Sequence, residues 1–103
     1  MKRGEVRWYK LQHPDKKRPI LILSRNSAIE FLGEVTIAPI TSTIRHIDSE
    51  VILTMREGMK NDCAVNLDHI QTVAKAKIGT LITYLSEEKM QQVIKALLFA
   101  LGE

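Results

Sequence analysis

Short runs of apolar residues, separated by turn-forming and charged residues, fill the first two thirds of the chain, and this pattern is typical of strands. Strands are predicted at residues 5–9, 19–23, 34–41, 50–54, 63–67, 70–73 and 79–85, where 63–67 and 70–73 are alternatively one long, bent strand. The run 19–23 is apolar throughout, which indicates a strand buried on both faces or lying at the centre of a barrel.

Prolines mark two special positions in this pattern. Pro39 lies inside the run 34–41, and because its nitrogen carries no hydrogen for the ladder, we expect it at a sheet edge or a bulge. The segment 12–18 is polar and basic and contains Pro14, so it is predicted to be a loop.

The end of the chain has the spacing of a helix. Ser86 is a good N-cap, and Glu87 and Glu88 follow it in the first turn, where the helix dipole favours carboxylates. Gly102 supplies the stop. The apolar stripe recurs at helical spacing and consists of Met90, Val93, Ile94, Leu97, Leu98 and Leu101. A shorter helix or turn is predicted at residues 26–31.

Many short strands followed by one helix predict a mainly β protein of the α+β class. We expect a small barrel or strongly bent sheet of about six to seven strands, with the C-terminal helix packed against it. The chain shows no internal repeat and no linker, so residues 1–103 are expected to form a single domain. Hydrophobic residues make up 45% of the chain and charged residues 26%, which allows a real core and argues against disorder.

Positive charge is concentrated at the start of the chain. Residues 1–25 carry eight basic and two acidic side chains, a balance of +6, whereas residues 26–103 carry seven basic and ten acidic ones, a balance of −3. This asymmetry indicates one face suited to a polyanion, or alternatively ordinary solvated surface charge.

Several kinds of chemistry are excluded or disfavoured. The single cysteine, Cys63, rules out a disulfide scaffold and a multi-thiolate metal site, and its apolar strand context indicates a small core residue rather than a nucleophile. The five glycines are scattered and form no phosphate-binding loop, and no group of His, Cys, Asp and Glu has zinc spacing. We therefore expect no metal and no other cofactor.

The expected location is the cytoplasm, without membrane association. No apolar run approaches the roughly 20 residues that a membrane helix needs. The first residues, MKRGEVRW, lack the hydrophobic segment of a signal peptide.

The three histidines are His13, His46 and His69. Imidazole titrates near neutral pH, and a pair of histidines can cleave RNA by general acid–base catalysis. The favoured interpretation is three unrelated polar surface residues, of which His69 is nearest a plausible site.

Five segments carry a resemblance to a known family when taken in their order and spacing. They are RGEV (3–6) followed by Trp8, KRPILILS (17–24), APITS (38–42), NDCAVNLDHIQTV (61–73) and LSEEKM (85–90). In these segments the chain resembles, nearly from end to end, the MazF/PemK toxins of toxin–antitoxin systems, which are small cytoplasmic endoribonucleases.

The resemblance implies a barrel like the SH3 fold, a homodimer, and metal-independent cleavage of single-stranded RNA at short sequence motifs. In the family, the arginine of the Arg-Pro pair and the threonine of the Pro-Ile-Thr segment carry catalysis; here these are Arg18 and Thr41. A guanidinium offers planar donors for phosphoryl oxygens, and a hydroxyl orients the same phosphate. The structural alternatives are a salt-bridged residue at a strand entry for Arg18 and a hydroxyl bonded to its own backbone for Thr41.

Other residues are candidates to bind the RNA around this pair. Lys16 and Lys17 would contact phosphates, and Trp8 and Tyr9 are candidates to stack on bases, although core packing or a dimer contact is the alternative for Trp8. Ser42 and Thr43 add hydroxyls after Thr41, and strand alternation places His69 and Gln71 on one face, where they are candidates to read base edges. The family often has Gln and Arg at these last two positions, which changes the donor pattern. The loop 12–17 is short and lacks the glycines and the acidic residue seen in some relatives, and because this loop helps to shape the RNA site, the target motif cannot be borrowed from a relative.

A basic cleft of this kind is expected to be silenced by a cognate antitoxin, whose acidic, partly disordered segment folds across it. Two other functions remain open. CcdB-like toxins use the same barrel to bind DNA gyrase through the end of their C-terminal helix, a pattern that residues 99–103 do not show. A non-catalytic relative that only binds nucleic acid is the third reading.

Overall fold

The computed structural model describes residues 1–11 and 16–103. The elements follow one another as β1 (Glu5–Lys10), β2 (Lys17–Ile22), α1 (Asn26–Phe31), β3 (Glu34–Thr41), β4 (Glu50–Leu53), η1 (Met55–Glu57), β5 (Cys63–Asn66), η2 (Leu67–His69), β6 (Gln71–Ala74), η3 (Lys75–Lys77), β7 (Ile78–Tyr84) and α2 (Glu87–Ala100). The elements labelled η are single turns of 3₁₀ helix.

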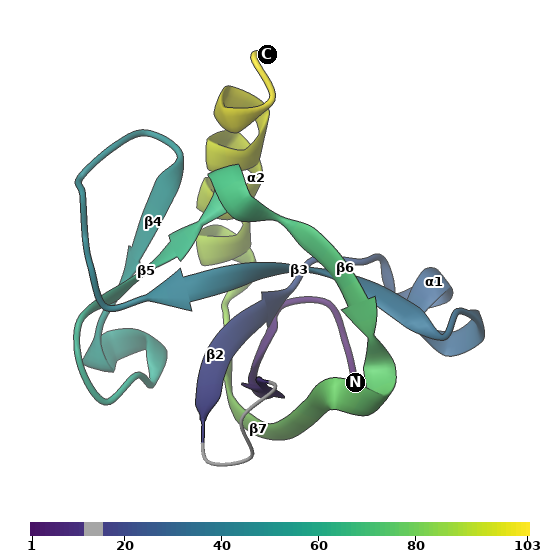
Figure 1. Cartoon of the computed structure of the whole chain (residues 1–103). Helices are drawn as coiled ribbons and strands as arrows, with labels where there is room; N and C mark the ends of the chain where they lie inside the picture. Colours follow the sequence, from purple (N-terminus) through teal and green to yellow (C-terminus); the bar gives the residue numbers. More distant parts are fainter. Residues whose placement is uncertain (12–15) are drawn as a thin grey trace.

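The strands form a curled antiparallel sheet that α2 covers. The strand order is β4-β5-β3-β2-β1-β7, and β6 pairs with the first half of β3. The long strand β3 therefore has β2 on one side, and first β6 and then β5 on the other. The sheet bends around itself, and α2 stands beside β4 and behind the turn η2 that follows β5 in this view (Figure 1). The predicted α+β class, bent sheet and terminal helix are confirmed.

Strand β2 is buried on both faces, as the apolar run predicted. Leu21 and Leu23 pack into a cluster formed with β4, β5 and α2, whereas Ile20 and Ile22 pack into a second cluster with α1, β3 and β6. Neighbouring residues of one strand point to opposite faces, so an uninterrupted apolar run requires a core on each side.

Helix α2 begins where the sequence predicted. The Ser86 side chain accepts a hydrogen bond from the Lys89 backbone N–H at 3.1 Å, and Gly102 has a φ of +85° just beyond the end. The predicted stripe is buried only in its first part: Val93 is fully buried, but Leu98 and Leu101 are exposed. Ala96 takes the inward position near the end instead, so the last turn presents apolar side chains to solvent. None of the described residues forms a helix long and apolar enough to span a membrane.

The expectation for Pro39 is wrong. Pro39 lies inside the central strand β3, opposite Ile20 of β2. The Leu23 N–H donates to the Thr36 carbonyl at 2.9 Å, and hydrogen-bonded pairs between antiparallel strands recur at every second position. Ile20 and Pro39 are therefore a pair without hydrogen bonds, and β2 needs no hydrogen from the Pro39 nitrogen. The Pro39 nitrogen therefore points away from β2, to the place where the other neighbour of β3 changes from β6 to β5.

Pro19 ends the pairing between β2 and β3. By the same alternation, Pro19 and Ile40 would be the next hydrogen-bonded pair. The Pro19 nitrogen would have to donate to the Ile40 carbonyl, but a proline nitrogen carries no hydrogen. The register accordingly stops at Ile20 and Pro39, while Pro19 still pairs with Trp8 of β1 on its other side. Beyond this point β2 and β3 diverge.

Two other boundaries differ from the sequence pattern. Lys17 and Arg18 belong to β2 rather than to the predicted loop, whose residues 12–15, with His13, lie outside the described residues. The segments 63–67 and 70–73 are two strands separated by η2, because the Asn66 side chain accepts from the Asp68 N–H at 3.0 Å and starts a turn.

The two clusters make a prediction about adjacent residues. Leu21→Ala and Ile22→Ala should each lower the free energy of unfolding by about 2–5 kcal/mol, because each truncation leaves a cavity in a different core. Urea unfolding measures both, with exposed Leu81→Ala as the control. A sheet with only one buried face would leave one of the two variants close to wild type.

Candidate active site

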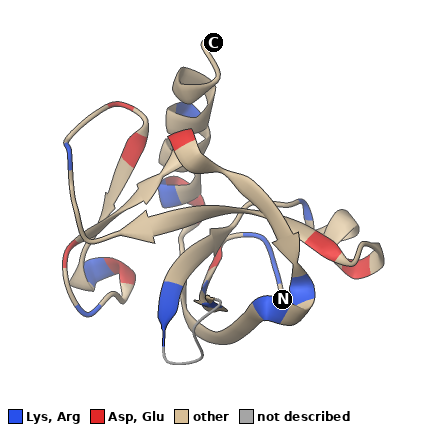
Figure 2. Ribbon diagram, viewed as in Figure 1, with Lys and Arg blue, Asp and Glu red and all other residues tan. Residues whose placement is uncertain are grey.

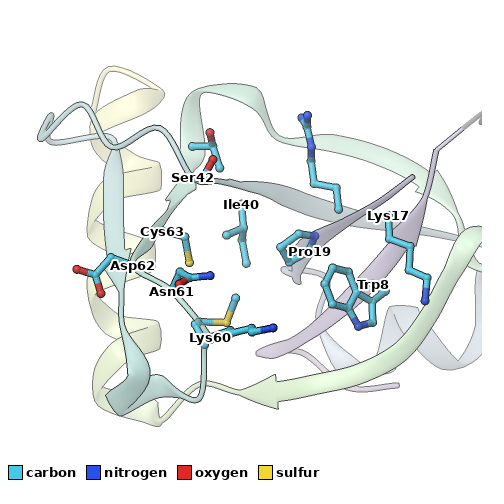
Figure 3. A pocket seen from close by; sticks show the side chains of 12 residues that line it. Trp8, Lys17, Pro19, Ile40, Ser42, Lys60, Asn61, Asp62 and Cys63 are labelled. Atoms are coloured by element: carbon cyan, nitrogen blue, oxygen red, sulfur yellow. The ribbon is translucent and has the colours of Figure 1, made fainter. Parts of the chain in front are cut away.

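A cleft of about 350 Å³ opens where β2 and β3 diverge (Figure 3). One wall comes from the ends of β1, β2 and β3, and the other from the segment that leads into β5. The lining residues are Trp8, Lys17, Arg18, Pro19, Ile40, Thr41, Ser42, Met59, Lys60, Asn61, Asp62 and Cys63.

The strand register explains why Arg18 and Thr41 lie together. The pairing of β2 with β3 stops at Ile20 and Pro39, and Arg18 and Thr41 each stand two residues beyond that last pair, on the diverging ends of the two strands. Both therefore line the cleft that opens between these ends. The structure thus brings together the two residues proposed to be catalytic, with Lys17 and Ser42 beside them.

The surroundings of Arg18 leave its guanidinium available. Its side chain is exposed, and among the described residues it forms neither an ion pair nor a hydrogen bond. The alternative of a salt-bridged residue at the strand entry finds no support in residues 1–11 and 16–103. A guanidinium whose donors are free can bind the oxygens of a phosphate.

Thr41 is held by its own backbone, as the structural alternative anticipated. The Thr43 N–H donates to Thr41 Oγ1 at 3.1 Å, which fixes the side chain at the cleft rim. This bond uses one lone pair of the hydroxyl and leaves its hydrogen free to donate. The bond to the backbone thus leaves the hydroxyl able to take the role predicted for it, and Thr43 contributes its backbone N–H rather than its side chain.

An aromatic residue and a lysine form the end of the cleft nearest β1. Lys17 Nζ lies 5.9 Å from the centre of the Trp8 ring, a cation–π distance, and the two side chains stand side by side in Figure 3. Trp8 is half-buried and lines the cleft, whereas Tyr9 packs against the second core cluster. Of the two aromatic residues considered for base stacking, only Trp8 is in position.

Comparison with known proteins identifies the family. Residues 2–101 match the model of the PemK-like, MazF-like toxins of type II toxin–antitoxin systems. The chain belongs to the PemK/MazF toxin family. It is 33% identical over 103 residues to the probable endoribonuclease MazF2 of Mycobacterium tuberculosis, covering 99% of both chains, and 35% identical over 96 residues to the probable endoribonuclease MazF5, covering 92% of this chain and 87% of the other.

Solved structures agree with this assignment. The M. tuberculosis toxin MazF-mt6 superposes with a TM-score of 0.86 at 32% identity, over 95% of this chain and 96% of the other. An endoribonuclease from a mycobacterial species, solved in complex with its cognate antitoxin, gives a TM-score of 0.87 at 27% identity, over 99% and 95%. The gyrase-binding alternative is not favoured by these matches.

The second wall of this MazF-type cleft was not predicted as a site. Lys60, Asn61 and Asp62 lie on it, exposed, opposite the ends of β2 and β3. They belong to a segment that carried the family resemblance, and a polar triplet just before a buried strand is the signal by which they could have been found. The Asn61 amide extends toward the cleft and is suited to hydrogen-bond base edges, whereas the Asp62 carboxylate points away from the cleft (Figure 3).

A capped turn supports this wall. The Thr54 N–H donates to Glu57 Oε1 at 2.7 Å and the Arg56 N–H donates to Thr54 Oγ1 at 3.2 Å, which forms the capping box of η1. Gly58 follows with a φ of +94°, and a Cβ there would meet Thr83 Oγ1 at 2.5 Å, so only glycine fits. Hydrogen bonding from the Thr54 backbone lowers the pKa of Glu57.

Cys63 is the small core residue that the sequence indicated. It is buried and its thiol faces the Leu53 carbonyl at 3.8 Å. Burial raises the pKa of the Cys63 thiol, aided by the negative charge of Asp62. The thiol is therefore a poor nucleophile, although Cys63 borders the cleft.

Four residues predicted to bind RNA lie outside the cleft: Lys16, Thr43, His69 and Gln71. The alternation that placed His69 and Gln71 on one strand face is wrong, because His69 belongs to the turn η2 and Gln71 begins β6. The His69 ring contacts Asn66, with Nδ1 3.3 Å from Asn66 Nδ2. His46 and His69 are both exposed, as expected for unrelated surface histidines.

The capping carboxylate gives a pH-dependent prediction. Because the folded pKa of Glu57 lies below its ordinary value, its stabilisation is present at neutral pH and is lost as the pH falls through the folded pKa. Glu57→Gln should therefore be less stable than wild type at pH 6.5, and this difference should shrink at pH 3.5. Urea unfolding at both values tests this, with exposed Glu30→Gln as the control. An equal difference at both values would assign the loss to packing instead of charge.

Proposed function

We propose that this protein is the toxin of a toxin–antitoxin pair and acts as a sequence-specific, metal-independent endoribonuclease on single-stranded RNA. The observation that carries the proposal is the meeting of a free guanidinium, Arg18, and an oriented hydroxyl, Thr41, in one open cleft. The endoribonuclease names of the relatives support the same activity.

The proposed reaction is an internal transfer at phosphorus. The 2′-oxygen of a ribose attacks the adjacent phosphorus, the bond to the 5′-oxygen of the next nucleotide breaks, and the 2′-hydroxyl proton is balanced by a proton gained at that leaving oxygen. The products are a 2′,3′-cyclic phosphate end and a 5′-hydroxyl end. This reaction needs no water and no metal to balance.

Each residue of the pair has a role that follows from its surroundings. Arg18 stabilises the negative charge that grows on the phosphoryl oxygens, and it does so best because no carboxylate of the described residues neutralises it. The Thr41 hydroxyl donates to one of the same oxygens, held in place by the Thr43 N–H. A guanidinium is a poor proton acceptor, so we assign Arg18 stabilisation of charge rather than the role of base.

The remaining cleft residues bind the RNA. Lys17 and Ser42 contact the phosphates near the reacting one, with Lys16 at the rim, and Trp8 offers a face for a base. The Asn61 amide, which extends toward the cleft, is able to read base edges. His69, Gln71 and Thr43 would touch only nucleotides beyond the cleft.

We further propose a cognate antitoxin and a homodimer, with the cytoplasm as the place of action. The relative solved with its cognate antitoxin supports the first partner. For the homodimer, the exposed apolar end of α2, where Leu98, Phe99 and Leu101 are each about half or more exposed, offers a surface that self-association would cover.

Removal of the guanidinium should abolish cleavage. Arg18→Ala is expected to lower the rate by at least about 10² to 10³-fold, because the charge on the phosphoryl oxygens loses its principal donor. Purified protein is incubated with long single-stranded RNA in EDTA and the fragment ends are sequenced, which also maps the target motif. Exposed Arg25→Ala is the matched control. Toxicity that survives Arg18→Ala in a folded protein would favour a gyrase-type action over a nuclease.

The Thr41 hydroxyl should make a smaller contribution. Thr41→Val removes one hydrogen bond to a charged oxygen and is expected to slow cleavage about 10 to 100-fold. Thr41→Ser keeps the hydroxyl and should retain most of the rate, as measured with the same RNA. A larger loss in Thr41→Ser than in Thr41→Val would show that the methyl group, and not the hydroxyl, is needed.

A further inference from the structure

Two neighbouring strands, and the turn that leads into a third, each carry a lysine at the same end of the sheet. Lys10, the last residue of β1, lies directly opposite Lys17, the first residue of β2. On the other side of β1, Tyr9 pairs with Ile78, and one further step of that register sets Lys77 beside Lys10. The lysine row, as we call Lys17, Lys10 and Lys77, runs from β2 across β1 to the last residue of η3, directly before β7.

The lysine row is uncompensated in the described part of the chain. Like charges directly opposite each other destabilise a sheet, so such a row has a cost unless an anion lies over it. All three side chains are exposed, and the ion pairs of the described residues are Arg7 with Glu5 and Lys89 with Glu57. Lys75, in contrast, donates its Nζ hydrogen to the Ile29 carbonyl and has a structural role.

The row continues the cleft. Lys17 belongs to both, and residues directly opposite in an antiparallel pair point to the same face, so Lys10 lies on the face that Lys17 shares with Trp8. Strands lie about 4.8 Å apart, so the row carries the positive charge about 10 Å away from the cleft. Figure 2 shows basic residues at the start of β2 and in the turn before β7, while the acidic residues in view gather mainly around β4 and between α1 and β3.

We propose that Lys10 and Lys77 extend the RNA site of this chain by holding the phosphates of nucleotides that flank the cleaved bond. This rests on the proposed ribonuclease function. Lysines act as point charges that attract any phosphate, so the row adds affinity without reading sequence. A row of lysines offers no apolar pocket for a side chain, which favours a nucleic-acid backbone over a polypeptide.

The test compares long and short RNA. Both RNAs carry the mapped cleavage sequence, with a 2′-deoxy nucleotide in place of the ribose whose 2′-oxygen would attack, which prevents cleavage. The short RNA contains only the cleavage sequence, and the long RNA has additional nucleotides on both sides of it. Lys10→Gln combined with Lys77→Gln should reduce the affinity advantage of the long RNA about tenfold or more, and should lower the slope of log affinity against log salt by about 1.4. Arg45→Gln combined with Lys95→Gln removes the same charge from exposed positions away from the row and is the control.

The outcomes separate this inference from the function on which it rests. Wild-type protein that leaves all RNA intact in EDTA overturns the ribonuclease proposal. Wild-type protein that cleaves, with an unchanged length advantage in the Lys10 and Lys77 variant, overturns only the inference. If the Lys10 and Lys77 variant kept its RNA affinity but bound a polyglutamate peptide more weakly, the row would be assigned to an acidic protein partner. If the Arg45 and Lys95 control lost as much RNA affinity as the Lys10 and Lys77 variant, the effect would be one of net charge and the inference would be overturned.

Discussion

The cleft depends on Pro19, whose backbone nitrogen carries no hydrogen. Pro19 cannot donate to Ile40, so β2 and β3 separate one pair after Ile20 and Pro39, and the cleft occupies the space between them. Pairing of β2 with β1 is undisturbed because the alternation turns Pro19 away from β1 at that level. In the Arg-Pro pair, the proline thus opens the cleft that the arginine lines.

Opening a cleft inside a sheet requires that the strands on either side remain rigid. Ile20 and Leu21, just inside the point of divergence, belong to different core clusters, so β2 is fixed from both faces up to the residue before the site. The opposite wall packs into the first cluster through Met59 and Cys63, and local devices add to this support, namely the capping box of Thr54 and Glu57 and the close approach of Gly58 to Thr83.

The sequence predicted the elements well because their signals are local. The apolar run of β2, the cap at Ser86 and the spacing of α2 each depend on a few neighbouring residues. The juxtaposition of Arg18 and Thr41 depends on register between distant segments, which the resemblance supplied and the residue pattern did not. Residues 60–62 were missed because only the tertiary fold brings the segment before β5 to the cleft. The prediction of a strand around His69 did not take into account the cap that Asn66 provides for η2.

The half-buried ring of Trp8 has a practical consequence for solution work. The chain contains one tryptophan, and that residue lines the cleft with a lysine ammonium near its face. All indole emission from this protein therefore originates at the site itself, and an anion that draws Lys17 away or a base that covers the ring alters the polarity around the fluorophore. Tryptophan fluorescence therefore reports whether the cleft is occupied, without an added label and without emission from another tryptophan.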